Sequence, residues 1–348
     1  MGICISIVSS EIHETDYGHE NAVYYEETNS FNETQRIGSV YSQQGSKGSN
    51  QDAAILYQGY GMADGTFCGV FDGHGKNGHI VSRFVRNHLP SLLLNQRNDL
   101  TKNNTVASNV KIRNRNKIAE GELVPQKNFH KQKEACISAF KVIDRKIKHL
   151  ENLDCSCSGT TAVVVVRQGE DLVIANLGDS RAVLGTVRDD GIMAVQLTTD
   201  LKPGLPSEAD RIRKCNGRVG ALKEEPHVQR VWLPHDDTPG LAMSRAFGDF
   251  LLKNHGLIAL PDVSYHRLTP NDKFLVLATD GVWDVLKNDH VIWIVHSAEN
   301  EEAAAKAVVE AAVAAWKQKY PSSRRDDCTV LCLFLQKRIQ QHCLPLKT

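Results

Sequence analysis

The chain of 348 residues lacks any apolar run of about 18 or more residues, the length that a membrane-spanning helix needs. It also lacks a surplus of charge of either sign, because Lys plus Arg and Asp plus Glu both number 41. Nucleic-acid-binding domains usually present a basic face, so we do not expect nucleic acid as a partner. No secretory signal opens the chain, and we therefore expect an intracellular protein.

The nine cysteines are scattered without the regular spacing of a disulfide framework. An odd number of cysteines, most of them in apolar β-prone runs, indicates reduced thiols in an intracellular protein. Cys155 and Cys157 form the one close pair, and without a second pair this spacing is weak support for a zinc or redox site. We interpret both as small residues in a loop that precedes a strand.

The N-terminus carries a pattern for lipid attachment. Met1-Gly2-Ile3-Cys4-Ile5-Ser6 fits the myristoylation pattern M-G-x-x-x-[ST], in which Gly2 is acylated after Met1 is removed. One myristoyl chain binds membranes only marginally, and a palmitoyl chain on Cys4 would make the attachment stable. We predict a protein at the plasma membrane with a cytosolic pool; a chance match of six residues is the alternative. Residues 9–36 are polar and acidic, so 1–36 is interpreted as an acylated flexible tether.

The folded domain is predicted to extend from Ile37 over 37–337, with a short C-terminal tail at 338–348. Short apolar runs separated by Gly and Asp turns favour antiparallel sheets, including a hairpin between Gln168 and Asp171. Apolar residues at helical spacing predict a helix of about five turns that follows Gly75 and ends near Asn95. The same spacing predicts further helices at 136–150, 289–298 and 303–319.

Two segments of this domain lack a clear periodicity. The segment at about 96–128 is polar and basic, and we interpret it as a solvated loop, with a partner-docking loop or a membrane-facing basic patch as the alternative. The stretch 222–240 contains three prolines among mixed charges. It is interpreted as an irregular surface flap, and Trp232 lies within it.

Acidic residues stand at the ends of three apolar, β-prone runs. The run 67–71 leads into Asp72, Gly73 and His74, the run 274–279 leads into Asp280, and Asp326 precedes the run 328–335. If these strand ends meet, their carboxylates form one site for hard divalent cations. Such cations can activate a bridging water and neutralise a phosphoryl group. A two-metal phosphatase is therefore the leading hypothesis.

A series of short motifs extends this pattern along most of the chain. They are Lys47-Gly48-Ser49-Asn50-Gln51-Asp52, Gly69-Val70-Phe71-Asp72-Gly73-His74-Gly75, Ser158-Gly159-Thr160-Thr161-Ala162, Gly178-Asp179-Ser180-Arg181, Asp200-Leu201-Lys202-Pro203, Ser244-Arg245-Ala246-Phe247-Gly248-Asp249, Pro261-Asp262-Val263, Asp280-Gly281-Val282-Trp283-Asp284 and Arg325-Asp326-Asp327. In this order they resemble the metal-dependent type 2C serine/threonine protein phosphatases, in particular the N-myristoylated plant members. The resemblance implies an α+β fold, namely a β-sandwich of two antiparallel sheets flanked by helix pairs in four layers, αββα.

The resemblance also implies a set of metal ligands. Asp72 would bridge two Mg²⁺ or Mn²⁺ ions, with the Gly73 carbonyl on one ion and Asp280 on the other. Asp326 would share the Asp280 site, and Asp52 with Gln51 would hold metal-bound waters. A third, weaker site would use Asp179, Asp280 and Asp284. Because all of these donors are oxygens, they favour Mg²⁺ or Mn²⁺ over Zn²⁺.

Two further residues carry expected roles in catalysis. Lys47 stands where many relatives have an arginine that binds the phosphate; a lysine neutralises phosphate as a point charge, without the bidentate fork. His74 resembles the proposed general acid that protonates the leaving alkoxide, a role suited to an imidazole. A structural histidine that bonds its own turn is the alternative for His74.

The remaining conspicuous side chains are interpreted as structural. Arg181 and Arg245 are expected to tie loops together, and Trp316 is expected to lie in the core. Asp200, Asp249 and Asp262 are expected to be hydrogen-bond acceptors that fix loops.

The sequence thus predicts a monomeric, metal-dependent protein phosphatase that acts on phosphorylated proteins. It would hydrolyse phosphoserine and phosphothreonine monoesters by in-line attack of a metal-bridging water or hydroxide. One alternative is a catalytically weak pseudophosphatase that serves as a membrane-anchored scaffold or sensor. Another is a different two-metal hydrolase, although such sites usually include several histidine ligands.

Overall fold

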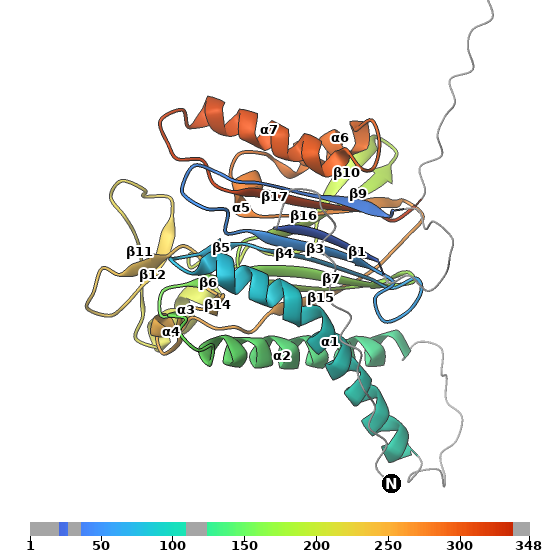
Figure 1. Cartoon of the computed structure of the whole chain (residues 1–348), viewed down its shortest axis with the longest axis horizontal. Coiled ribbons are helices and arrows are strands. Elements are labelled where there is room, and N and C mark those ends of the chain that lie inside the picture. Colours follow the sequence, from blue (N-terminus) through green and yellow to red (C-terminus); the bar gives the residue numbers. More distant parts are fainter. Residues whose placement is uncertain (1–20, 27–35, 109–123, 337–348) are drawn as a thin grey trace, which may run out of the picture.

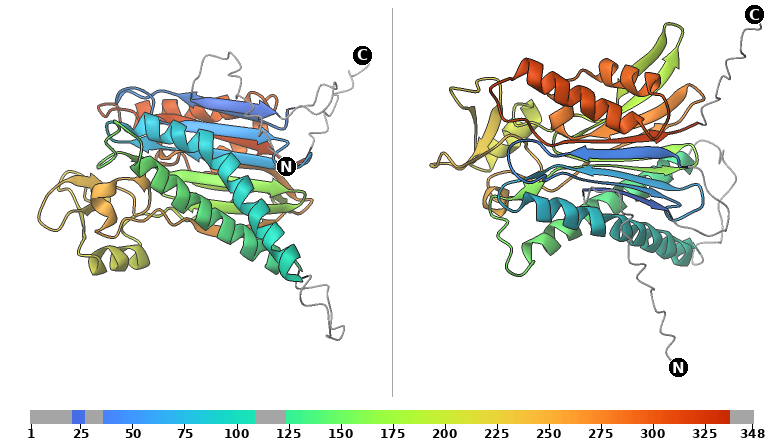
Figure 2. Two further views of the ribbon diagram at one scale, coloured as in Figure 1. Left: turned by 60° about the horizontal axis from the view of Figure 1, so that its bottom comes forward. Right: turned by 45° about the horizontal axis from the view of Figure 1, so that its top comes forward.

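Two stacked β-sheets form the centre of the structure. The computed structural model describes residues 21–26, 36–108 and 124–336. Helices α1 (Gly78–Ser108) and α2 (Val124–Lys148) cover one sheet, and α6 (Asn288–Ser297) and α7 (Ala304–Lys319) cover the other, as Figures 1 and 2 show. The expected α+β sandwich with the four layers αββα is therefore confirmed.

The sheet that packs against α1 and α2 has six strands in the order β1-β3-β4-β7-β8-β15. They are β1 (Ala22–Glu26), β3 (Ala53–Gln58), β4 (Thr66–Phe71), β7 (Ala162–Gln168), β8 (Asp171–Leu177) and β15 (Asp262–Arg267). Alternate residues of a strand point to opposite faces, so Val164 packs in the helix-side core and Val163 in the core between the sheets. The predicted hairpin is confirmed, because Gln168 pairs with Asp171 in antiparallel register.

The second sheet has five antiparallel strands in the order β10-β9-β16-β17-β2. They are β10 (Gly191–Gln196), β9 (Arg181–Arg188), β16 (Asp272–Ala278), β17 (Cys328–Phe334) and β2 (Gly38–Gln43). The helices predicted at 289–298 and 303–319 pack against it as α6 and α7. Trp316 of α7 lies in the core, as expected, and its indole Nε1 donates to the carbonyl of Gly281 at 2.6 Å.

The prediction of a loop at 96–128 is wrong at both of its ends. Helix α1 continues past Asn95 to Ser108, and α2 begins at Val124 rather than near 136. No Gly or Pro interrupts 91–108, and Leu100 still packs against the helix-side core. Residues 109–123 lie outside the described residues. None of the helices in the described ranges is both long and apolar enough to cross a membrane.

The prediction of a flexible tether over 1–36 is wrong for residues 22–26. They form the edge strand β1, which pairs in parallel with β3 and is an exception to the expected antiparallel pattern. The Tyr24 hydroxyl donates to Gln58 Oε1 at 2.5 Å and accepts from the Ile37 amide at 3.1 Å. These contacts come from distant positions, which explains why local composition did not reveal the strand. Gly2, Cys4 and the C-terminal tail lie outside the described residues.

The prediction of an irregular flap at 222–240 is also wrong in part. Strands β11 (Arg218–Ala221), β12 (Gln229–Trp232) and β13 (Pro239–Leu241) form a small antiparallel sheet beside one end of the sandwich (Figure 1). Trp232 is buried, and its Nε1 donates to the carbonyl of Gly220 at 3.0 Å. Gly240 has φ +71°, and a Cβ there would lie 2.4 Å from the Trp232 ring. The indole therefore packs within its own sheet.

A buried carboxylate joins helix α3 (Pro206–Lys214) to the segment that follows β13. Glu208 of α3 is 1% exposed and accepts hydrogen bonds from Arg211, Arg245 and the Ser244 hydroxyl. Burial raises the pKa of Glu208, but these donors outweigh it and lower that pKa from 4.5 to about 2. The expected role of Arg245 in tying loops together is confirmed by this contact.

We predict that Glu208→Gln lowers the free energy of unfolding at pH 7 by about 3 kcal/mol, because two arginines lose the buried charge that they contact. The folded pKa lies below the unfolded value. The contribution of the carboxylate is therefore complete above pH 4.5 and is lost as the pH falls toward about 2. Urea unfolding at pH 7 measures the difference, and the same measurement at steps from pH 5 down to pH 2.5 measures its decline. Glu225→Gln, at the half-exposed partner of Arg230, is the control and should cost less than about 1 kcal/mol. An equal effect of the two substitutions would contradict the assignment.

Candidate active site

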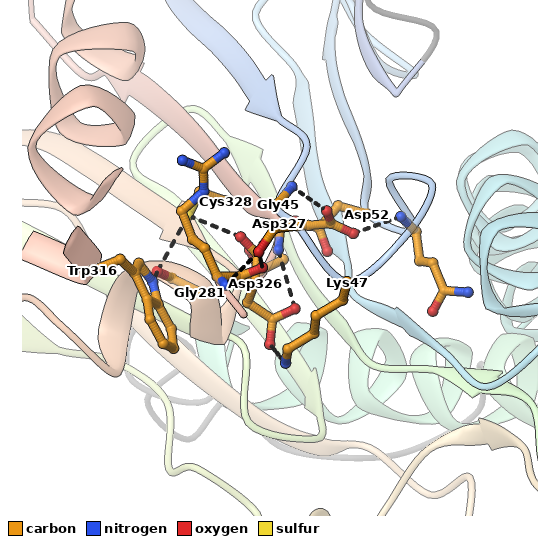
Figure 3. A network of polar contacts seen from close by, with 12 residues as sticks. Gly45, Lys47, Asp52, Gly281, Trp316, Asp326, Asp327 and Cys328 are labelled. Carbon is orange, nitrogen blue, oxygen red and sulfur yellow. Dashed lines mark hydrogen bonds and ion pairs between the residues drawn. The ribbon is translucent and has the colours of Figure 1, made fainter. Parts of the chain in front are cut away.

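Four strands end at one place between the two sheets. Asp52 directly precedes β3, Asp72 directly follows β4, Asp280 begins the short helix α5 (Asp280–Trp283) after β16, and Asp326 lies just before β17. Strands β3 and β4 are neighbours in one sheet, and β16 and β17 are neighbours in the other. Figure 3 shows Asp52 and Asp326 in one network of polar contacts, together with Lys47 and Asp327.

The electrostatics indicate that the acids lie near one another. Burial, followed by the negative charges of Asp52, Asp326 and Asp179, raises the pKa of Asp72 well above its usual range. Burial and the charge of Asp72 raise the pKa of Asp280 in the same way, and the two carboxyl groups share a hydrogen bond. Asp72, Asp280 and Asp326 thus lie near enough to influence one another, and their role as metal ligands stays a prediction.

The residues expected at the third metal site also lie together. Asp179 follows β8 and Asp284 follows α5, and the charges of both help to raise the pKa of Asp280. Asp179 is 2% exposed, and its Oδ2 lies 3.4 Å from the ammonium of Lys202. Its other oxygen, Oδ1, is buried without a hydrogen-bond partner among the described residues. A buried carboxylate oxygen in that state suits a cation ligand.

The backbone around Asp72 is fixed by close contacts. The Asp72 amide donates to Thr161 Oγ1 at 3.0 Å, and the Thr161 amide donates to the Asp72 carbonyl at 2.9 Å. The next residue must be glycine, because a Cβ on Gly73 would lie 2.5 Å from the carbonyl oxygens of Gln51 and Gly78. The close packing at Gly73 therefore holds the turn that carries the Gly73 carbonyl.

The residues fit hard divalent cations, although the described residues contain no group of three His, Cys, Asp or Glu side chains already gathered closely enough to hold one. The negative charges of neighbouring carboxylates raise the pKa of Asp72, and two lysines contact Asp326 and Asp179. The donors are carboxylate oxygens and one backbone carbonyl, which are the ligands that Mg²⁺ and Mn²⁺ prefer. A cation would replace the repulsion with attraction and draw the donors together.

Asp52 and Asp327 fasten the loop that precedes β3. Asp52 is buried, and its Oδ2 accepts from the Thr279 hydroxyl at 2.9 Å. Asp327 accepts from the amides of Gly45 and Gln51 at 2.7 and 2.8 Å, so it binds this loop to the start of β17. The Gln51 side-chain amide donates to the carbonyl of Gly75 at 2.7 Å. The role expected for Asp52 and Gln51, holding metal-bound waters, stays a prediction.

Lys47 reaches the acid cluster from this same loop. Its ammonium contacts the Asp326 carboxylate, as Figure 3 shows, while 54% of the side chain remains exposed. Burial lowers the pKa of Lys47, but Asp326, Asp280 and Asp72 outweigh it, and the pKa is raised. A protonated lysine over the cluster is placed to meet an anion that arrives from solvent.

His74 lies on the short strand β5 (Gly73–His74). It contacts the carboxylate of Asp249, a residue that was expected only to fix a loop. Its Nε2 lies 2.7 Å from Asp249 Oδ2. Burial lowers the pKa of His74, but Asp249 outweighs it, and the pKa is raised. The two residues are 175 positions apart, so no local pattern could have paired them. By contrast, the expected role of Asp200 as a hydrogen-bond acceptor that fixes a loop is confirmed. Its carboxylate accepts hydrogen bonds from Nε and Nη2 of Arg181.

Comparisons with known proteins agree with this geometry. The family model described as protein phosphatase 2C matches residues 38–319. The probable protein phosphatase 2C 72 of Arabidopsis thaliana is 53% identical over 98% of this chain and 99% of its own length. The probable protein phosphatase 2C 12 of Oryza sativa subsp. japonica is 47% identical over 96% of this chain and 92% of its own length. The crystal structure of serine-threonine phosphatase 2C from Toxoplasma gondii matches with a TM-score of 0.72 and 27% identity, and covers 85% of this chain and 93% of that one.

We predict that Asp72→Asn stabilises the metal-free protein, because it removes one of several buried like charges. The expected gain is roughly 1 kcal/mol, or about 2–4 °C in the melting temperature of a domain of this size. Mn²⁺ should raise the melting temperature of the wild type and should not raise that of the variant. Thermal unfolding with excess EDTA and with Mn²⁺ measures both effects. A metal-free variant that melts below the wild type would contradict the repulsion argument.

Proposed function

This chain belongs to the protein phosphatase 2C family and is a metal-dependent protein serine/threonine phosphatase, and we propose that the acid cluster between its sheets is the catalytic site. The observation that supports this assignment is the placement of Asp72, Asp280 and Asp326 at strand ends of the two facing sheets, which the hydrogen bond from the Thr279 hydroxyl to Asp52 joins. The pseudophosphatase alternative is not supported, since every expected acid is present and the relatives are named as phosphatases.

We assign two Mg²⁺ or Mn²⁺ ions to Asp72, the Gly73 carbonyl, Asp280 and Asp326, with Asp52 holding coordinated waters. The unpartnered Oδ1 of Asp179 supports a third, weaker site with Asp280 and Asp284. When bound, such ions supply an activated hydroxide and positive charge against the phosphoryl oxygens. The protein's own part is to keep these carboxylates at fixed strand ends, so that the nucleophile and the phosphate are held in line.

Lys47 and His74 complete the proposed site. Lys47 has one ammonium and an exposed stem, so it can exchange its contact with Asp326 for a phosphate oxygen of the substrate. His74, which contacts Asp249, would donate a proton to the serine or threonine oxygen as the ester bond breaks. Phosphorylated proteins are the substrates, and we propose that the chain acts on them as a monomer.

We predict that the purified protein releases phosphate from a phosphothreonine peptide with Mn²⁺ or Mg²⁺ and stops with excess EDTA. Asp72→Ala should retain less than about a tenth of wild-type turnover, because the bridging carboxylate is lost. Asp210→Ala, which removes an exposed acid of α3, is the control and should turn over like the wild type. Turnover by Asp72→Ala above this limit, or phosphate release that EDTA leaves unchanged, would refute the site.

We also propose that Gly2 is myristoylated and Cys4 palmitoylated, which would attach the phosphatase to the plasma membrane with a cytosolic pool. The sequence Met1-Gly2-Ile3-Cys4-Ile5-Ser6 supports this proposal. Membrane placement would then restrict the phosphoproteins that the enzyme meets.

Gly2→Ala should move the protein from the membrane pellet to the soluble fraction of cell extracts, because the acyl acceptor is lost. Cys4→Ser should release it only in part, since one myristoyl chain still binds marginally. Ile3→Ala changes a position where the pattern accepts any residue, and it should pellet like the wild type. Unchanged pelleting of Gly2→Ala would refute the anchor.

A further inference from the structure

A second small sheet brings His74 and Asp249 together. Its strands have the order β14-β6-β5, with β14 (Phe247–Gly248) and β6 (Gly159–Thr160) beside β5. His74 on one outer strand and Gly248 on the other both pair with Gly159 on the central strand. Asp249 follows β14 directly, so its side chain and that of His74 meet beside Gly159.

The contact between the two side chains is direct and well buried. His74 Nε2 lies 2.7 Å from Asp249 Oδ2, and the Asp249 side chain is 1% exposed. An ionised carboxylate only accepts hydrogen bonds, so Nε2 is the nitrogen that donates to it. The other ring nitrogen, Nδ1, is buried and has no partner among the described residues. The carboxylate therefore fixes both the ring orientation and the nitrogen that remains available.

Glycine at position 159 is required by this pair. A Cβ there would lie 2.3 Å from Asp249 Oδ2 and 2.9 Å from His74 Nε2, as well as 2.2 Å from the carbonyl oxygen of Phe247. Any larger residue would push the carboxylate and the imidazole apart. The absence of a side chain at Gly159, on the central strand of this sheet, thus leaves the space in which the two side chains meet.

The backbone of Asp249 supports the same conclusion. Its φ of 49° and ψ of 47° are left-handed, a conformation that residues with a side chain rarely adopt. The conformation is held by the Asp249 amide, which donates to the carbonyl of Ser158 at 3.0 Å. Strained residues of this kind persist where the surrounding structure determines them, and they cluster at functional sites.

A separate set of contacts holds the same loop without touching His74. Asp144 of α2 accepts from the Gly248 amide at 3.0 Å and lies 3.2 Å from the ammonium of Lys253. Lys253, in turn, donates to the carbonyl of Ala246 at 2.7 Å. Asp144 is therefore a matched control, since its loss loosens the loop but leaves the carboxylate on the histidine.

We propose that Asp249 is the positioning residue for His74, holding its Nε2–H so that Nδ1 delivers the proton to the leaving serine or threonine oxygen. The inference rests on the proposed function, in which His74 is the general acid. In the step, a hydroxide oxygen forms a new bond to phosphorus, and the bond from phosphorus to the alkoxide oxygen breaks with its electron pair on that oxygen. The Nδ1 proton moves to this oxygen, which gives an alcohol, hydrogen phosphate and a neutral imidazole. Solvent then returns a proton to the ring.

The test compares two substrates whose leaving groups differ in their need for a proton. The leaving group of a phosphothreonine peptide is an alkoxide, which must be protonated. The leaving group of p-nitrophenyl phosphate is p-nitrophenolate, which is stable without a proton. Asp249→Asn keeps the shape and tolerates the left-handed backbone, but it removes the charge. It should lower kcat for the peptide about 10²-fold and kcat for p-nitrophenyl phosphate less than about threefold, because general acid catalysis contributes on that scale only where a proton is needed.

Two further variants keep the test decisive. Adding His74→Gln to Asp249→Asn should cause no further loss on the peptide, because residues that act as a unit are not additive. Asp249→Gly also removes the carboxylate and accepts the left-handed backbone, and it should show the same selectivity between substrates if Asp249→Asn does not fold. Asp144→Asn should change both substrates by one common factor.

Three results would overturn the inference. They are equal losses of Asp249→Asn on the two substrates, full activity of that variant on the peptide, or a selective loss in Asp144→Asn of the same size. A wild-type protein without metal-dependent turnover on either substrate would instead overturn the proposed function, and the inference would fail with it. Metal-dependent wild-type turnover with equal losses in Asp249→Asn leaves the phosphatase intact and refutes only the role of Asp249.

Discussion

The structure depends on one constraint, which is the burial of several like charges at a single place. Asp52 and Asp179 are almost fully buried, and Asp72 and Asp280 are partly buried. The charges of Asp52, Asp72 and Asp179 each raise the pKa of at least one other carboxyl group. A cluster of this kind opposes folding unless positive charge offsets it. The ammonium groups of Lys47 and Lys202 contact only two acids of this cluster, Asp326 and Asp179. Divalent cations are the natural complement to what remains.

Much of the surrounding structure resists this repulsion. Strands β3, β4, β16 and β17 end side by side, so their ladders of backbone hydrogen bonds hold the acids in place. Thr161 makes two hydrogen bonds to the backbone of Asp72, one through its hydroxyl and one through its amide. The Trp316 indole donates to the carbonyl of Gly281, the residue after Asp280. Asp327 binds the loop that carries Lys47 to the start of β17. The sandwich thus acts as a rigid frame whose strand ends carry the chemistry, which is how precise sites are usually held.

The sequence revealed the features that are local. An apolar run followed by Asp and Gly located Asp72 and Asp280, and helical spacing located α6 and α7 to within a residue or two at their ends. It missed what depends on distant partners. Strand β1 pairs with β3, and its Tyr24 hydroxyl accepts a hydrogen bond from the Ile37 amide. Strand β12 is held by Trp232, which donates to the Gly220 carbonyl and packs against Gly240. The contact between His74 and Asp249 joins two motifs that were both noted, but only the small sheet pairs them.

The central claim is that the buried acids form a binding site for divalent cations that depends on Asp72. Calorimetric titration of Mn²⁺ into metal-free protein tests it most directly, because it counts ions without any need for turnover. The account predicts at least two bound ions for each wild-type chain and the loss of tight binding in Asp72→Asn. A variant that binds as many ions as the wild type, with equal affinity, would contradict the account.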